Sequence, residues 1–213
     1  MPAGEQAYDQ LTASPDKMYF TVSYPSGSDM RNLEQQITRY AAYHRDRRNI
    51  ATHFMGVPMI VFSVVLALVP WTIMGVNVAL IAIGAAAVFY LILDVTLGTV
   101  ALALLFFSYL VAIYLNARLD HTAVILGLAA LLFVFGWVIQ FIGHQYEGLK
   151  PAFTDDIVGL AIGPLFVVTE VFFALGLKSA LKKYVEARVG PVMAARNGAP
   201  IGPGIESSPA SQA

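Results

Sequence analysis

Residues 122–142, TAVILGLAALLFVFGWVIQFI, contain no charged side chain. An α-helix rises 1.5 Å per residue, so a helix over this stretch is long enough to cross a bilayer core, which takes about 20 apolar residues. Three further apolar stretches precede it, at 54–70, 73–93 and 96–116, and a fifth follows at about 157–177. We therefore predict an all-α, polytopic helical membrane protein with about four to five transmembrane helices.

The composition supports a membrane protein and excludes several other classes. Hydrophobic residues make up 57% of the chain and charged residues 13%, against roughly 25% charged in an average soluble domain. A soluble fold of this composition would expose large apolar patches, whereas lipid removes that cost. The net charge of −1 and the absence of a basic run interleaved with aromatics give no indication of a nucleic-acid partner. The chain has no cysteine, which excludes disulfides, thiolate metal ligands and thiol nucleophiles.

Both ends of the chain are predicted to lie outside a single helical membrane domain at 29–187. Residues 1–28 are rich in Gly, Pro, Ser and Asp and are expected to form a loose polar arm. Residues 188–213 are rich in Gly, Pro, Ala and Ser and are expected to form a disordered tail. The arm has neither the basic start nor the apolar run of a signal peptide, so the first membrane helix is expected to direct insertion.

An amphipathic helix is predicted over residues 29–48, just before the first apolar stretch. Leu33, Ile37, Tyr40 and His44 recur at spacings of four, three and four, which places them on one helical face. The opposite face is charged and ends in a basic run. That run consists of Arg45, Arg47 and Arg48. The pattern predicts a helix at the membrane interface, with its basic end solvated among lipid headgroups.

Turns and a break are predicted between the apolar stretches. Pro70-Trp71 closes the first stretch, and Asp94 separates the second from the third. The fifth contains Gly163-Pro164 and a carboxylate, Glu170, and is predicted to be broken or tilted. Basic residues lie before the first stretch and after the fifth, so the positive-inside rule places both of these segments in the cytoplasm. Five full crossings would place them on opposite sides of the membrane and cannot satisfy the rule.

The four histidines of the chain lie at the edges of the apolar stretches. His53 opens the first stretch and His144 closes the fourth, so four crossings place both at the same membrane surface. His44 lies just before His53 and therefore belongs to that surface too. His121 opens the fourth stretch, about 35 Å along a helix from His144, which is too far to share a metal ion. Three histidines are thus predicted to converge.

Carboxylates lie close to these histidines in the sequence. Glu147 follows His144 by one helical turn, and Asp156 opens the fifth stretch. Three imidazoles with carboxylates at one membrane surface suit Fe(II), Zn or Mn. The alternative interpretation is a set of polar boundary residues paired with one another.

Two motifs carry a resemblance to a known family. The first consists of Tyr43-His44, Asn49 and His53, followed by Gly56-Val57-Pro58. The second runs from Gln140 to His144, with Glu147, Asp156 and Gly163-Pro164 downstream. Together they resemble the 2-hydroxy fatty acid dioxygenase family, which includes a yeast enzyme of phytosphingosine breakdown and bacterial membrane proteins. The resemblance covers roughly residues 33–175.

The resemblance implies an Fe(II)-dependent membrane dioxygenase that uses O₂ to shorten 2-hydroxy fatty acids by one carbon in α-oxidation. It implies that His44, His53 and His144 hold Fe(2+) and are catalytic together with Glu147. The candidates for an additional ligand, or for a residue that supports the ligands, are Glu147, Asp156, Asn49 and Glu170. Asp46-Arg47 stands where many relatives have Asn-Pro. The spacing after His144 is that of bacterial members and favours a bacterial inner membrane over the endoplasmic reticulum.

Two hypotheses from other classes compete with this one. A small ion or proton transporter, or a channel-like protein, would use Glu170 and the histidines to line a path. It predicts polar groups spread through the depth of several spans, whereas the second to fourth stretches are almost purely apolar. A non-catalytic scaffold gives no reason for three histidines to meet. The expected partners are therefore a 2-hydroxy fatty acid, O₂ and the lipid bilayer; the sequence does not indicate an oligomeric state.

Overall fold

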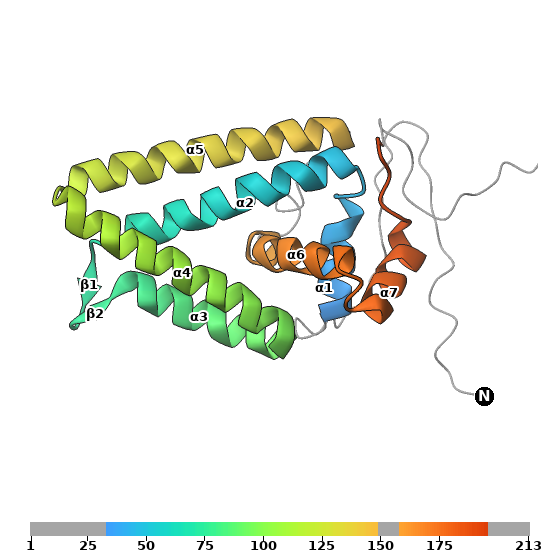
Figure 1. The fold of residues 1–213 in the computed structure, drawn as a ribbon, viewed down its shortest axis with the longest axis horizontal. Helices are drawn as coiled ribbons and strands as arrows, with labels where there is room; N and C mark the ends of the chain where they lie inside the picture. The colour runs from blue at the N-terminus through green and yellow to red at the C-terminus, as the bar shows by residue number, and fades with distance from the viewer. Residues whose placement is uncertain (1–32, 149–157, 196–213) are drawn as a thin grey trace, which may run out of the picture.

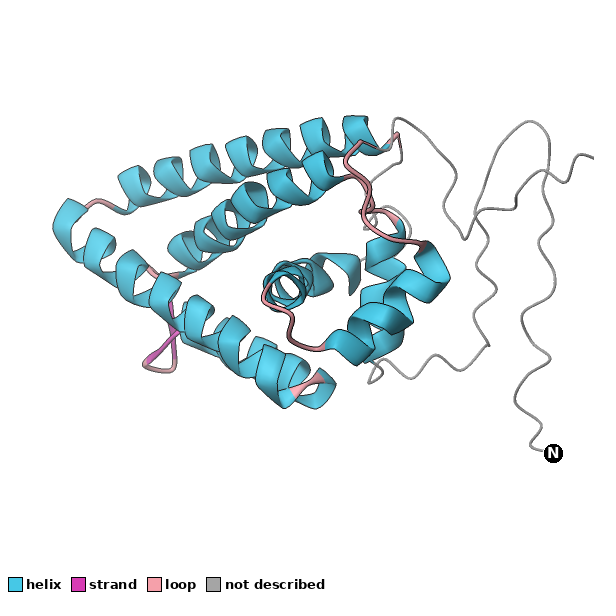
Figure 2. Cartoon of the chain, turned by 45° about the vertical axis from the view of Figure 1, so that its right-hand side comes forward, coloured by secondary structure: helices cyan, strands magenta, loops and turns pink. Residues whose placement is uncertain are grey.

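The computed structural model describes residues 33–148 and 158–195, which form seven helices and one short hairpin (Figures 1 and 2). In chain order these are α1 (Leu33–Ala42), α2 (Arg47–Leu68), β1 (Thr72–Ile73), β2 (Val76–Asn77), α3 (Val78–Leu93), α4 (Val95–Leu119), α5 (Thr122–Glu147), α6 (Val158–Ala174) and α7 (Ser179–Val189). The prediction of an all-α chain is confirmed. The predicted arm at 1–28 and Asp156 lie outside the described residues.

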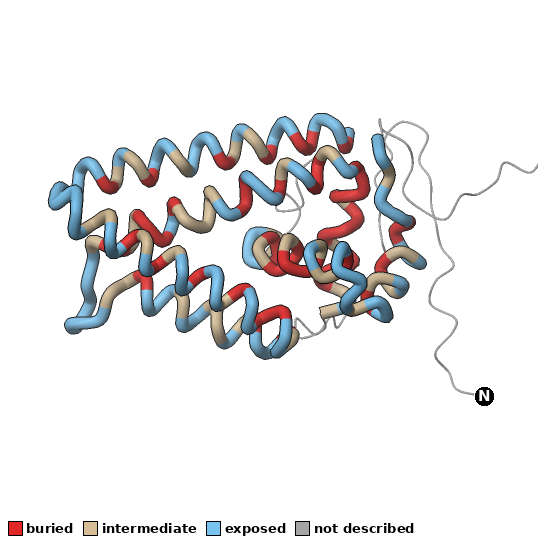
Figure 3. The backbone as a smooth tube through the Cα atoms, in the orientation of Figure 1, coloured by how far each residue is buried: buried red, intermediate tan, exposed pale blue. Residues whose placement is uncertain are grey.

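The helices form two antiparallel pairs with a shorter group at one end. In Figure 1, α2 and α5 lie side by side along their length, and α3 and α4 form the second pair. At one end α6 packs against α1, α2 and α4, and α7 packs against α1. Buried residues are dense where α1, the start of α2 and α6 meet (Figure 3). This end of the bundle shares one buried core with the α3–α4 pair.

The apolar helices make the chain a helical membrane protein. By length and composition, α2, α4 and α5 can each cross a bilayer, and α6 with α7 forms a fourth candidate that is bent by 110°. α3 has 16 residues and is shorter than a usual span. Large apolar side chains on the outer surface remain exposed, for example Phe107 at 65% and Phe135 at 54%. In a bilayer these side chains contact lipid rather than water.

The predicted amphipathic helix at 29–48 is wrong in its extent and its place. α1 ends at Ala42, and α2 begins at Arg47 because Asp46, in an extended conformation, accepts the N–H of Arg48 as an N-cap. The first span therefore starts seven residues before the predicted residue 54. α1 does not lie on the surface, since Ile37 and Ala41 are fully buried in one core with residues of α6 and α7.

A hairpin replaces the start of the predicted second span at 73. Strands β1 and β2 pair in antiparallel register, and the residues between them, Met74 and Gly75, both have positive φ angles of 51° and 80°. Two such residues form the type I′ turn that suits the twist of a two-residue hairpin. Asn77 then caps α3 by accepting the N–H of Ala79. The turn predicted at Pro70-Trp71 is confirmed.

The predicted turn at Asp94 is confirmed, and the break in the fifth stretch lies elsewhere than expected. Asp94 ends α3 and caps α4 by accepting the N–H of Leu97. Pro164 lies inside α6, and the chain bends only after Ala174. Lys178, which precedes α7, places its Nζ 2.6 Å from Asp94 Oδ2. This ion pair joins the α3–α4 turn to the bend between α6 and α7.

The disordered tail predicted from residue 188 starts too early. Residue 188 is still inside α7, and Met193 forms a parallel bridge with Asp46. The Arg47 N–H donates to the Met193 carbonyl at 2.9 Å, and the Met193 N–H donates to the Arg45 carbonyl at 2.8 Å. The chain after α7 therefore returns to cover the connection between α1 and α2. Residues 196–213 lie outside the described part.

Candidate metal centre

Three histidines from three parts of the chain meet at this end of the bundle. His44 comes from the α1–α2 connection, His53 from the second turn of α2 and His144 from the last turns of α5. All are buried, with exposed fractions of 0%, 2% and 6%. Each offers one nitrogen, and these nitrogens all lie within 4.8 Å of one another. The structure thus brings the predicted residues together; their role as ligands stays a prediction.

Hydrogen bonds orient two of the rings. His44 Nδ1 lies 2.6 Å from the Tyr40 carbonyl, and His53 Nδ1 lies 2.9 Å from the Asn49 carbonyl. A carbonyl oxygen can only accept, so each Nδ1 carries the proton and donates it. Each neutral ring therefore presents a lone pair at Nε2. This is how histidine ligands of metal ions are usually oriented.

The two Nε2 atoms of His44 and His53 face each other at 2.9 Å. With both Nδ1 atoms protonated, neutral rings have no proton to place between these nitrogens, so two lone pairs oppose each other. Burial and the neighbouring His53 and His144 hold the pKa of His44 well below its ordinary value, which disfavours a shared extra proton. A bound cation resolves this arrangement, so the donor set fits a metal ion.

Tyr40 forms one wall of the centre. Its ring stacks on His44 at 4.2 Å between centroids with an interplanar angle of 3°, and Phe166 of α6 lies 4.7 Å from the Tyr40 ring. The sequence placed Tyr40 and His44 on one helical face, but gave no signal that this face would be buried. The face is buried because the apolar sides of α1 and α6 cover each other.

Glu147 is fully buried and holds the connection that carries His44. Its Oε1 accepts the Arg45 N–H at 3.0 Å, and its Oε2 accepts the Asp46 N–H at 2.9 Å and Asn49 Nδ2 at 3.1 Å. Both carboxylate oxygens of Glu147 thus accept hydrogen bonds from N–H groups. Among the described residues, the group that could hold a metal ion consists of the three histidines and does not include Glu147. The geometry favours a positioning role for Glu147 over the predicted place among the ligands.

Asn49 connects this carboxylate to a histidine. The side-chain NH₂ of Asn49 donates to Glu147 Oε2 and to the Tyr43 carbonyl, each at 3.1 Å. The backbone carbonyl of Asn49 accepts the hydrogen bond of His53 Nδ1. Asn49 therefore fixes the connection and the ring of His53 at the same time. This agrees with the predicted supporting role of Asn49.

The predicted solvated position of Arg45 is wrong. Its exposed fraction is 1%, because residues after α7 cover it. Its Nε donates to the carbonyls of Ala41 and His44 at 2.9 Å, and its Nη1 donates to Gly190 at 3.2 Å. Burial lowers the pKa of Arg45, and the nearby carboxylates of Glu170 and Glu147 oppose that shift. Arg45 is thus a structural cation inside the bundle.

Glu170 and His121 do not join the centre. Glu170 Oε1 lies 3.6 Å from Arg45 Nη2, so the predicted possible ligand is instead the partner of a buried guanidinium. His121 is exposed and precedes α5, at the turn with α4 that lies at the opposite end of the molecule (Figure 1). The exclusion of His121 by distance is consistent with this place.

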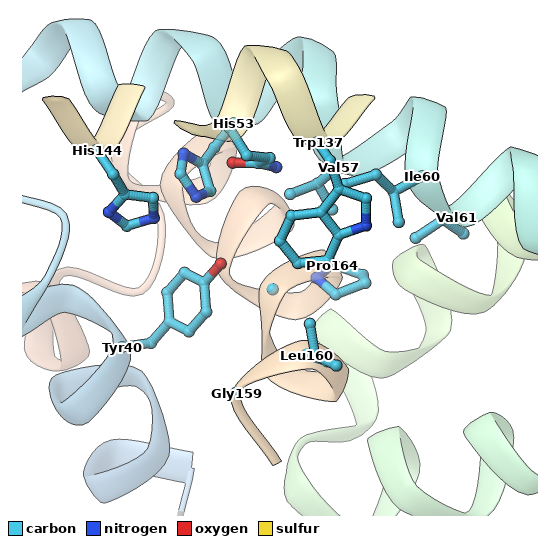
Figure 4. A pocket seen from close by; sticks show the side chains of 12 residues that line it. Tyr40, His53, Val57, Ile60, Val61, Trp137, His144, Gly159, Leu160 and Pro164 are labelled. Carbon is cyan, nitrogen blue, oxygen red and sulfur yellow. The ribbon is translucent and has the colours of Figure 1, made fainter. Parts of the chain in front are cut away.

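A cavity of about 60 Å³ opens beside the histidines, and apolar side chains extend it away from them. Figure 4 shows His53, His144 and Tyr40 around one end and Trp137 and Pro164 farther along. Its lining residues come from α1, α2, α5 and α6. They are Tyr40, His53, Val57, Ile60, Val61, Trp137, Gln140, His144, Gly159, Leu160, Gly163 and Pro164. The arrangement combines a polar, metal-suited end with an apolar groove.

Comparisons with known proteins agree with this picture. Residues 30–175 match the sequence model of a family described as 2-hydroxy-palmitic acid dioxygenase Mpo1-like. Over 164 residues the chain is 30% identical to the 2-hydroxy-palmitic acid dioxygenase MPO1 of Saccharomyces cerevisiae, with 75% of this chain and 91% of the yeast protein covered. No solved structure matches the chain. The matched region contains all three buried histidines.

Proposed function

The chain belongs to the 2-hydroxy-palmitic acid dioxygenase Mpo1-like family, and from that premise we propose an Fe(II)-dependent membrane dioxygenase that acts on 2-hydroxy fatty acids. The reaction breaks the bond between C1 and C2 and leaves a fatty acid one carbon shorter. One hydroxy acid and one O₂ give the shorter acid, CO₂ and water, which balances all atoms. The observation that carries the proposal is the buried cluster of His44, His53 and His144.

The three histidines would hold the metal ion. Neutral imidazoles suit Fe(II), and three protein ligands leave positions for other oxygen donors. When bound, Fe(II) supplies the Lewis acidity and redox chemistry that O₂ activation needs. The protein's contribution is to fix the lone pairs of the donors in advance, through the carbonyls of Tyr40 and Asn49.

The other residues around the centre keep it in place and dry. Glu147 holds the His44 connection through two backbone N–H groups. Tyr40 and Phe166 cover one side of His44 with aromatic surface. Exclusion of water strengthens the electrostatic interactions of a charged head group inside the site.

The groove supports a lipid substrate. On α2, His53, Val57 and Ile60 follow one helical face for about two turns, and on α5 His144 and Trp137 do the same in the opposite chain direction. An acyl chain along these apolar side chains would remain within the membrane while its carboxyl end reaches the histidines. We propose that the substrate enters from the bilayer. On the motif spacing, that bilayer is a bacterial inner membrane.

The transporter alternative is not supported by the position of Glu170. That hypothesis needed Glu170 to line a path together with the histidines. Instead Glu170 faces Arg45, and the histidines gather at one end of the bundle.

The proposal is tested by metal analysis and turnover of the purified protein. We expect about one iron per chain and, under O₂, conversion of 2-hydroxy-palmitic acid to the acid one carbon shorter, followed by mass spectrometry. His44→Ala, His53→Ala and His144→Ala should each lose metal and activity. His121→Ala is the matched control and should keep both. Protein without stoichiometric metal whose activity resists chelators would overturn the proposal.

A further inference from the structure

Gln140 carries a buried acceptor that the fold does not use. It lies one turn before His144 on α5, so both side chains share a helical face. Its exposed fraction is 5%, and its Oε1 has no hydrogen-bond partner among the residues that the structure describes. Leaving a buried acceptor unpaired costs free energy, and such atoms in native proteins call for a specific explanation.

The side chain of Gln140 is held in place by the helix opposite. A Cβ added to Gly56 of α2 would lie 3.1 Å from both Cγ and Nε2 of Gln140, and 2.9 Å from the carbonyl of Gly136. The glycine therefore gives the amide the room in which it rests. Close packing of this kind fixes the side chain against the α2 backbone. Its orientation is thus part of the α2–α5 contact.

Gln140 also lines the same cavity as the histidines. His53 and His144 form one end of that cavity, and Val57 and Trp137 lie farther along the groove. A head group at the histidines with its chain along the groove would pass directly beside Gln140. The first carbons of such a substrate would therefore pass the residue that carries the unpaired acceptor.

The chemistry of the acceptor selects one group of the substrate. An amide oxygen can accept a hydrogen bond but not donate one. Of the proposed reactants, an ionised carboxylate, an acyl chain and O₂ have no polar hydrogen to offer. The hydroxyl at C2 has one. We propose that Gln140 accepts the hydrogen bond of the 2-hydroxyl group and so distinguishes 2-hydroxy acids from ordinary fatty acids.

This inference rests on the proposed function and explains how the site would select 2-hydroxy acids over ordinary fatty acids. Ordinary fatty acids have the same chain and carboxylate, so neither the groove nor recognition of the carboxylate distinguishes them from 2-hydroxy acids. A site built to hydrogen-bond a hydroxyl rejects an analogue that lacks it, because the acceptor then stays buried and unpaired. One residue thus supplies a discrimination that the three histidines do not.

The experiment compares the binding of 2-hydroxy-palmitic acid and palmitic acid to metal-free protein in one detergent, so that neither metal nor turnover contributes. We expect the wild-type protein to prefer the hydroxy acid by about tenfold, the effect of one buried hydrogen bond. In Gln140→Leu the two affinities should become equal, with palmitic acid bound at least as well as before. Ser63→Ala, at a buried position of α2 outside the lining of the groove, should keep the tenfold preference.

Two results would overturn the inference. One is an unchanged preference in Gln140→Leu, and the other is an equal loss of affinity for both acids, which would show a purely structural role. Gln140→Met provides a second apolar variant if Gln140→Leu does not fold. Turnover by the wild-type protein is scored separately. A Gln140-dependent preference without O₂-dependent cleavage would support the recognition site and reject the dioxygenase. Cleavage without that preference would support the dioxygenase and reject the role of Gln140.

Discussion

Glu147 shows how a single buried side chain can set the position of a residue that lies about 100 positions away in the sequence. It lies on α5, one turn beyond His144, yet its carboxylate binds the backbone N–H groups of Arg45 and Asp46, which follow His44. N–H donors take the place of water around this fully buried carboxylate. One residue thereby fixes two of the three histidine-bearing segments relative to each other.

Replacement of Glu147 by Gln should weaken metal binding without removing a ligand. The new amide NH₂ must face at least one of the N–H donors that the carboxylate now accepts, so the His44 connection loses a contact and shifts. Loss of a group that supports a metal ligand typically lowers affinity by about 10–100-fold, measurable by competition with a chelator. Glu34→Gln, at an exposed position of α1, should leave the affinity unchanged. Equal affinities in both variants would contradict the positioning role.

The sequence indicated the histidines of the centre but not the residues that support them. Counting crossings was enough to bring His44, His53 and His144 to one surface and to exclude His121. Arg45 was expected among headgroups because its burial depends on chain that returns after α7, with the Gly190 carbonyl binding its guanidinium. Gln140 entered only as the first residue of the second motif and was given no role, since a lone amide in an apolar stretch becomes informative only when its partners are known.

At the level of helices, the closeness of α2 and α5 determines whether the histidines can meet. Gly143 adjoins His144, and a Cβ at this position would clash with Thr52 Oγ1 and lie 2.5 Å from Asn49 Oδ1. The absence of a side chain therefore allows α5 to rest directly on the segment of α2 that carries His53.

Gly143→Ala should push the two helices apart and disturb the centre. We expect a loss of stability of about 1–3 kcal/mol, typical of overpacking, together with weaker metal binding. Gly127→Ala on the same helix provides the control, because a Cβ there meets nothing within 4 Å. That variant should be neutral or slightly more stable, since alanine favours helix. Thermal unfolding in detergent measures both, and identical melting curves would contradict the argument.

The ion pair between Asp94 and Lys178 should make a modest, pH-dependent contribution to stability. Burial raises the pKa of Asp94, but hydrogen bonds from the Leu97 N–H and from Lys178 outweigh it and lower the pKa below its ordinary value. Because the folded-state pKa is the lower one, the contribution is complete above about pH 4 and is lost as the pH falls through the folded value.

Two variants separate the ion pair of Asp94 from its cap. Asp94→Asn keeps an N-cap and loses the charge, so it should cost about 1 kcal/mol at pH 7 and match the wild-type protein at low pH. Asp94→Ala loses the cap as well and should remain less stable at every pH. Unfolding midpoints between pH 3 and pH 7 test this. A pH-independent difference between Asp94→Asn and the wild-type protein would contradict the role of charge.

The helices themselves were predictable, while their ends depended on local signals that the apolar pattern concealed. Asp46 is a good N-cap residue, but the helical spacing that runs through residue 44 and the charged run at 45–48 predict a continuing helix. Gly75 lies inside the predicted span at 73–93, and its positive φ belongs to the hairpin turn that the prediction missed. The bend at 175–178 begins where Gly176, with a φ of 75°, ends α6 and the Leu177 N–H donates to the Phe172 carbonyl. The ion pair of Lys178 with Asp94 joins residues that are far apart in the sequence and meet only in the fold.

On the scale of the whole molecule, the long helices separate two ends that should face opposite sides of a membrane. The hairpin and the α4–α5 turn form one end, and α1 and α7 lie at the other (Figure 1). The histidines belong to this second end, because they lie at the start of α2 and the end of α5. The basic residues of the histidine end predict that it faces the cytoplasm.

Labelling of single cysteines can test this arrangement, because the chain contains no native cysteine. Met74 is 99% exposed at the hairpin, and Lys183 is exposed on α7. In sealed inner-membrane vesicles with the cytoplasmic face outward, a membrane-impermeant maleimide should label Lys183→Cys at once. Met74→Cys should react only after detergent is added. Labelling of both variants in sealed vesicles would contradict a bundle that spans the bilayer between them.

The distribution of the histidines along the chain also sets an order of events during synthesis. His44 and His53 are made before the first long helix is complete, and His144 comes at the end of the last one. At about 5–20 residues per second, the roughly 90 residues between His53 and His144 take on the order of 5–20 s to translate. An ion that meets the nascent chain during that interval finds two of its three donors. A centre that needs all three histidines could therefore take up a metal ion only after α5 has been made, which would make metal loading a late step of biogenesis.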